Sequence, residues 1–129
     1  MNTRSTRSRA LDRDARGAVT AELALGLPLL VAVTTGLAWL LAVGADQLRA
    51  VDAARETARA VARGDTTGAA VAVGERVAPE GATVRVATTG GQVRVTVTGE
   101  VAGPGGLFEA LPAAQLHAEA VAVLEEGPA

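Results

Sequence analysis

One carboxylate, Glu22, lies at the start of a long apolar run in the stretch DARGAVTAELALGLPLLVAVTTGLAWLLAVGADQ, residues 14–47. A charged residue at the centre of a membrane-spanning helix costs roughly 2.5–3.5 kcal/mol, and the cost falls near the edge, where the side chain reaches the interface. One interpretation is therefore that Glu22 only marks the boundary of the run. The other is that Glu22 has a partner, because ionisable residues in apolar spans commonly mark functional sites.

A partner for Glu22 arises if the chain is cut between Gly17 and Ala18. The cut gives Ala18 a positively charged α-amine and makes Glu22 the fifth residue, so the two groups stand about one helical turn apart. The amine could pair with Glu22 of its own chain or of a neighbouring subunit, which lowers the cost of both charges in a dry helical bundle. This ion pair would exist only after residues 1–17 have been removed.

The composition narrows the other chemistry that the chain can carry. Without Lys there is no phosphate-loop lysine or Schiff base, and without Cys there is no thiol nucleophile, disulfide or thiolate metal site. The serines lie only near the N-terminus, and a lone His117 has no second His to form a metal pair. The net charge of −2 argues against a strongly basic nucleic-acid binder. We expect a protein that is not an enzyme, with no catalytic residues, cofactor, metal, nucleic acid or small-molecule substrate.

The apolar run predicts a transmembrane helix over residues 18–45. No charged residue occurs from Leu23 to Ala45, and about 20 helical residues cross a bilayer core. A buried core helix is the weaker interpretation, because so small a protein could not surround it. Residues 1–17 form a polar, Arg-rich leader that we expect to be flexible.

The orientation follows from the flanks of this segment. Five Arg precede the apolar run and four follow it closely, so the charge asymmetry is slight. The short N-terminal tail and the larger C-terminal part favour a single-pass protein of the cell membrane with a cytoplasmic N-terminus.

The helix is predicted to continue beyond the membrane as an amphipathic extension over residues 46–64. Its apolar positions recur at intervals of three and four residues: Leu48, Val51, Ala54, Ala58 and Val61. The charges alternate in sign at intervals of three residues over Asp46, Arg49, Asp52 and Arg55, and Glu56 is spaced to pair with Arg59. Gly64 is a natural stop, so the tripeptide RGD at residues 63–65 is interpreted as a helix cap rather than as an adhesion motif.

Residues 65–129 predict a small extracytoplasmic α+β domain. A short helix carrying Ala70, Val73 and Val77 ends at Pro79, and ATVRVATTGGQVRVTVTG alternates as two strands around a Gly-Gly hairpin turn. One helical turn is expected around Phe108. Residues 115–125 fit a strand or a helix, and we favour a third antiparallel strand. The fold class is α+β, a long N-terminal transmembrane and amphipathic helix followed by a small antiparallel sheet.

The basic leader, Gly17, Glu22 and the apolar helix together resemble the class III signal sequence of type IV pilins. With Pro28 and the Ala/Arg-rich residues 52–64, the segment 16–64 looks more narrowly like the TadE family of tight-adherence minor pilins or pseudopilins. Ala18 stands where many major pilins have Phe.

This resemblance implies a pilin-like fold and cleavage between Gly17 and Ala18 by a prepilin peptidase. It also implies a role of Glu22 in subunit registry. The implied partners are other pilin subunits, a membrane assembly platform and its ATPase, and the implied location after processing extends to an extracellular pilus.

Two other interpretations stay open at this stage. A Sec-type signal peptidase could cut near Ala42 and Gly44, although the apolar run is longer than the usual signal core of about 7–15 residues. The chain could also be a single-pass structural membrane protein that is never processed. The N-terminal residue of the mature protein distinguishes these alternatives.

Overall fold

The computed structural model describes residues 3–125, with side chains from residue 13 onward except that of Leu107. The chain divides into two compact units, and the division falls between Leu37 and Ala38. The order of elements is a long helix, a short helix and three strands, which confirms the predicted α+β class.

Helix α1 runs from Thr3 to Ala62 and includes Pro28. The prediction of a flexible leader is wrong for residues 3–17, which are helical. The stretch 3–16 contains neither Gly nor Pro. Adding residues to an existing helix avoids the unfavourable nucleation step, so a segment without helix breakers joins it readily.

The first unit consists of helix, and its apolar side chains are exposed. No residue from 13 to 37 is buried, and Leu25 has 78% of its surface exposed. The hydroxyls of Thr20 and Thr34 donate to the carbonyls of Arg16 and Leu30, at 2.9 and 2.8 Å. These bonds satisfy the hydroxyls of Thr20 and Thr34 within the helix, which suits an apolar surrounding.

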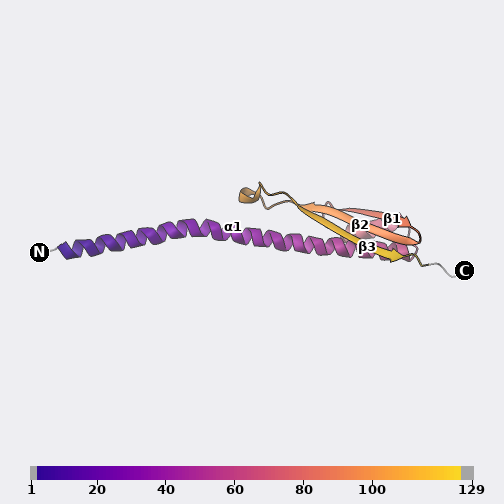
Figure 1. The fold of residues 1–129 in the computed structure, drawn as a ribbon, viewed down its shortest axis with the longest axis horizontal. Helices are drawn as coiled ribbons and strands as arrows, with labels where there is room; N and C mark the ends of the chain where they lie inside the picture. Colours follow the sequence, from indigo (N-terminus) through magenta and orange to yellow (C-terminus); the bar gives the residue numbers. More distant parts are fainter. Residues whose placement is uncertain (1–2, 126–129) are drawn as a thin grey trace. The chain divides into compact units, whose positions relative to one another are not determined.

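The second unit contains a three-stranded antiparallel sheet in the order β1-β2-β3 (Figure 1). The strands are β1 (Thr83–Thr89), β2 (Gln92–Val101) and β3 (Ala114–Val123). β3 confirms the third strand, which replaces the helical alternative for residues 115–125. Gly90 and Gly91 join β1 to β2 with φ of 58° and 75°, and positive φ at both positions is what a two-residue hairpin turn of type I′ requires.

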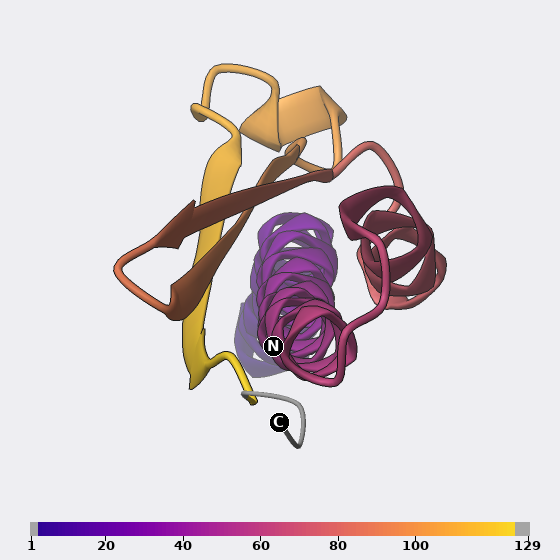
Figure 2. The same cartoon turned by 90° about the vertical axis from the view of Figure 1, so that its right-hand side faces the viewer.

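The C-terminal part of α1 lies between the sheet and helix α2 (Thr67–Val77), as Figure 2 shows. Side chains on the inner face of the sheet pack toward this helix, and Val93, Val95 and Val97 are fully buried. The residues that α1 contributes to the core are small: Ala50, Ala53, Ala54, Thr57, Ala58, Ala60 and Val61. Small side chains allow the helix to approach both of its neighbours closely.

The predicted amphipathic face of α1 is partly wrong. Ala54, Ala58 and Val61 are buried as expected, but Leu48 is 68% exposed and Thr57 is completely buried. A single apolar stripe describes a helix with one neighbour. Here the helix packs against the sheet and α2, so the buried face is wider than the stripe.

The end of α1 confirms that the RGD tripeptide is a helix cap. Gly64 has φ of +96°, its N–H donates to Val61 O at 3.0 Å, and the N–H of Asp65 donates to Ala60 O at 3.1 Å. This pair of bonds is the Schellman motif, which satisfies the last carbonyls of a helix.

Two of the ion pairs predicted along α1 are present, whereas among the described side chains no ion pair joins Asp52 to Arg55. Arg49 contacts Asp46 at 3.1 Å, and Arg59 contacts Glu56 at 2.6 Å. The arginines are about 60% exposed, so each pair adds little stability.

The predicted short helix and helical turn are also present. α2 begins after Thr66, whose side chain accepts a hydrogen bond from Ala69 N at 3.3 Å, and it ends at Val77, two residues before Pro79. The turn around Phe108 is the 3-10 helix η1 (Gly106–Phe108), in the connection between β2 and β3.

Candidate functional site

The three residues predicted to carry processing and assembly all lie on α1 in the first unit. Gly17, Ala18 and Glu22 are exposed. Positions 18 and 22 are four residues apart in a continuous helix, so they lie on the same face about one turn apart. The helix therefore brings the predicted amine and the predicted carboxylate position together.

Packing gives no reason for a glycine at position 17. A Cβ built on Gly17 would meet no atom within 4 Å. Gly inside a helix costs roughly 0.8–1.0 kcal/mol relative to Ala. The fold would thus gain stability from a larger residue, and recognition of Gly17 by another protein is consistent with its presence.

The apolar stretch of α1 has the exposure expected of a membrane anchor. Among the described residues, one helix is long and apolar enough to cross a membrane. No residue from 13 to 49 is buried, whereas a core helix of a soluble protein has a buried face. The long exposed helix supports a single-pass, membrane-anchored protein.

Within the second unit, two side chains of α1 bind backbone groups of β3 and of the connection after β2, and the sequence did not predict either contact. Trp39 Nε1 donates to Ala102 O at 2.8 Å, just after β2. Gln47 forms two hydrogen bonds with His117 in β3. No sequence pattern marks the carbonyl partner of Trp39, which lies 63 residues away in the sequence.

The packing of α1 against α2 depends on a glycine in the middle of α2. A Cβ built on Gly74 would lie 2.0 Å from Thr57 Oγ1 and 3.4 Å from Ala53 O. Thr57 Oγ1 donates to Ala53 O at 2.8 Å, which holds the hydroxyl in place. The sequence signal for this packing is the isolated Gly within a helical pattern, since such a glycine often lies where another part of the chain packs closely against the helix.

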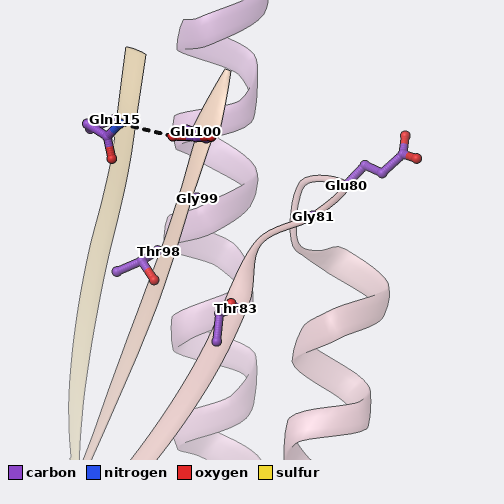
Figure 3. A pocket seen from close by; sticks show the side chains of 7 residues that line it. All are labelled: Glu80, Gly81, Thr83, Thr98, Gly99, Glu100 and Gln115. Carbon is purple, nitrogen blue, oxygen red and sulfur yellow. Dashed lines mark hydrogen bonds between the residues drawn. The ribbon is translucent and has the colours of Figure 1, made fainter. Parts of the chain in front are cut away.

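A polar depression with a volume of about 470 Å³ opens where the loop before β1 meets the ends of the strands (Figure 3). Its two acids do not converge: Figure 3 shows Glu80 pointing away from the strands, and Glu100 accepts a hydrogen bond from Gln115 at 3.3 Å. Among the side chains that the structure describes, no cluster of three or more His, Asp or Glu could hold a metal ion. This depression therefore offers no paired-acid arrangement.

Comparison with known proteins gives a match on helix α1, over parts of both units. Residues 17–59 match the family model of TadE, described as TadE-like protein. No curated protein and no solved structure matches the chain. The family match supports a protein associated with the Tad pilus. Over the segment that begins at Gly17 and includes Glu22 and Pro28, the chain is similar to TadE-like proteins.

Proposed function

We propose that this protein is a minor pilin or pseudopilin of the tight-adherence pilus, cut between Gly17 and Ala18 by a prepilin peptidase and then used in pilus assembly. Residues 1–17 act as the leader that the peptidase removes. Glu22 sets the registry between subunits by pairing with the α-amine of Ala18 on its own or a neighbouring chain. The partners are other pilin subunits, the assembly platform and its ATPase.

The observation that carries this proposal is where the family match begins. It starts at Gly17, the residue that precedes the proposed cut, and includes the carboxylate five residues later. Residues 1–16 lie outside the match.

The structure supports the same assignment through exposure. Gly17, Ala18 and Glu22 are exposed on α1, so the fold leaves them open to a peptidase and to neighbouring subunits. The apolar side chains that follow are exposed too, among them Leu25 and Leu29. In a membrane such a surface contacts lipid, and in a filament it packs against the same helix of other subunits.

The orientation proposed here places the leader in the cytoplasm and the second unit outside. The five Arg of the leader remain on the cytoplasmic side. The cut then frees the first helix to leave the membrane with the growing pilus, and the mature protein is located in the membrane and in the extracellular filament.

N-terminal sequencing of the mature protein, isolated from cells that carry the prepilin peptidase and from cells that lack it, tests the proposal. We expect the chain to begin at Ala18 in the first case and to retain the leader in the second. A chain that begins near Ala45 in both cases would establish Sec-type cleavage instead. A chain that keeps its leader in both cases would establish an unprocessed membrane anchor.

A further inference from the structure

The second unit begins inside the uncharged run. The run extends to Ala45, but residues from Ala38 onward belong to the second unit. Trp39 is the second residue of this unit, and its indole donates to Ala102 O at 2.8 Å within the unit. The apolar run is therefore longer than the part of the helix that is available to cross the membrane.

The end of the second unit that holds Trp39 carries a group of exposed apolar side chains. Figure 1 shows η1 at the end of the sheet where β2 ends and β3 begins, which is also where Ala102 lies. We define the apolar end as five residues of this unit: Trp39, Leu40, Leu41, Phe108 and Leu111. Leu40, Leu41 and Leu111 are 57%, 76% and 49% exposed, and the connection 102–113 carries one charged residue, Glu109.

We infer that the apolar end lies in the lipid headgroup region, and that the membrane-crossing segment is therefore residues 18–37 rather than 18–45. This inference rests on the proposed membrane anchor. The occupant of the apolar end is the bilayer surface, because Ala38 follows directly on the last residue of the crossing segment.

The hydrogen-bonding needs of the backbone limit how deeply the apolar end can enter the bilayer. Irregular backbone exposed to lipid does not enter the hydrocarbon core, because its N–H and C=O groups would lack water there. The connection 102–113 contains such backbone, so it must stay at or outside the interface. Trp39 is bonded to this connection and must lie at the same level. A Trp ring with an apolar body and a bonded N–H suits that region.

The lengths agree with this depth. Residues 18–37 number 20, and about 20 helical residues cross the hydrocarbon core of roughly 30 Å. Glu22 then lies four residues inside the crossing segment, about 6 Å along the helix from Ala18. The carboxylate is thus just inside the edge of the hydrocarbon core. An ionic partner there lowers the free-energy cost of burying its charge.

The depth of Trp39 in a bilayer tests the inference. The chain contains one Trp and no Tyr, so the fluorescence of the full chain in phosphatidylcholine vesicles reports on this residue, and lipids brominated at graded depths quench it. If residues 18–37 cross the membrane, we expect Trp39 about 17 Å from the bilayer midplane. If the whole uncharged run 23–45 crosses it instead, Trp39 would lie about 8 Å from the midplane. A depth near 8 Å would overturn the inference.

A second measurement examines the connection 102–113. The chain has no Cys, so an environment-sensitive dye can be attached to Leu111→Cys. The matched control is Val123→Cys, which is 68% exposed at the opposite end of β3. We expect a lipid-like emission and quenching by headgroup-level quenchers for position 111 and a water-like emission for position 123. Equal, water-like emission from both positions would overturn the inference.

Val31→Cys separates this inference from the membrane anchor on which it rests. Val31 lies in the middle of the apolar run and is 57% exposed. A dye in the hydrocarbon core at position 31, with water-like dyes at 111 and 123, would refute the interfacial placement alone. A water-like dye at position 31 would refute the membrane anchor as well.

Discussion

Gln47 on α1 makes two hydrogen bonds with the backbone of His117 in β3. Its Nε2 donates to His117 O at 2.7 Å, and its Oε1 accepts from His117 N at 3.3 Å. β3 is an edge strand of the sheet, and edge strands offer backbone groups that can pair with another chain. The amide of Gln47 therefore occupies part of the β3 edge and ties the strand to the long helix.

Replacing Gln47 by Leu removes both hydrogen bonds and leaves the His117 backbone groups to water. A net contribution of about 0.5–1.5 kcal/mol for each bond predicts a loss of roughly 1–3 kcal/mol in the free energy of unfolding. Hydrogen exchange at the His117 amide should become faster, and urea unfolding should shift to lower concentration. Leu48→Ala, a neighbouring position that is 68% exposed, is the control and should change neither. Unchanged protection of the His117 amide in Gln47→Leu would contradict this role.

Gly74→Ala should destabilise the second unit through a clash with Thr57. The new Cβ would lie 2.0 Å from Thr57 Oγ1, and overpacking of this kind typically costs about 1–3 kcal/mol. Gly68→Ala in the same helix is the matched control, because a Cβ there meets nothing within 4 Å, and we expect it to be neutral or stabilising. Unfolding in urea, followed by Trp39 fluorescence, measures both.

The clash predicts that Thr57→Ala rescues Gly74→Ala. Removing Oγ1 leaves Thr57 Cβ at 3.4 Å from the new methyl group, which is ordinary contact. The double variant should therefore be more stable than the sum of the two single changes predicts, as in a double-mutant cycle between touching residues. Strict additivity would show that Gly74 matters for another reason.

Val95→Ala should cost roughly 2 kcal/mol of stability, because it removes two buried methyl groups and leaves a cavity. Val95 is fully buried on the inner face of β2. Val121→Ala makes the same chemical change at a position in β3 that is 50% exposed, and it should cost much less. Equal losses at both positions would argue against the α1–sheet core as the source of stability.

Glu22→Gln should leave cleavage after Gly17 intact and prevent assembly, since it keeps the shape of the side chain and removes its charge. The readouts are the N-terminal sequence of the protein and the amount of chain in sheared filaments. Glu75→Gln, which neutralises an exposed acid on α2, is the control and should assemble normally. Normal assembly of Glu22→Gln at wild-type protein levels would refute the registry role.

Much of the local structure was predictable from the sequence, because short-range chemistry determines it. The alternation of Val and Arg or Thr predicted β1 and β2, and the Gly-Gly pair predicted their turn. Gly64 predicted the end of α1 at the RGD tripeptide, and the hydrogen bonds of Gly64 and Asp65 confirm it. The candidate residues Gly17, Ala18 and Glu22 were also chosen from sequence alone, and their positions on one helix follow from their spacing.

The leader and the buried face of α1 were not predictable from local patterns. The polar composition of residues 1–17 suggested a tail, whereas an unbroken stretch of helix-compatible residues extends α1 to Thr3. The apolar period placed Leu48 in the core and left Thr57 out, but the structure reverses both assignments. The burial of a residue depends on how many elements pack against its helix. The spacing of apolar residues along one helix does not reveal how many such elements there are.

The sequence by itself determined that this chain carries an apolar helix with an acid near its start, followed by a small sheet. These features arise from the period and composition of consecutive residues. Only the tertiary structure decided where the second unit begins and which side chains of α1 bind the rest of that unit, Trp39 to Ala102 and Gln47 to His117. The physical reason is that these contacts join side chains to backbone atoms more than 60 residues away. A backbone carbonyl is the same chemical group in every residue, so the sequence cannot mark which one an indole or an amide will find.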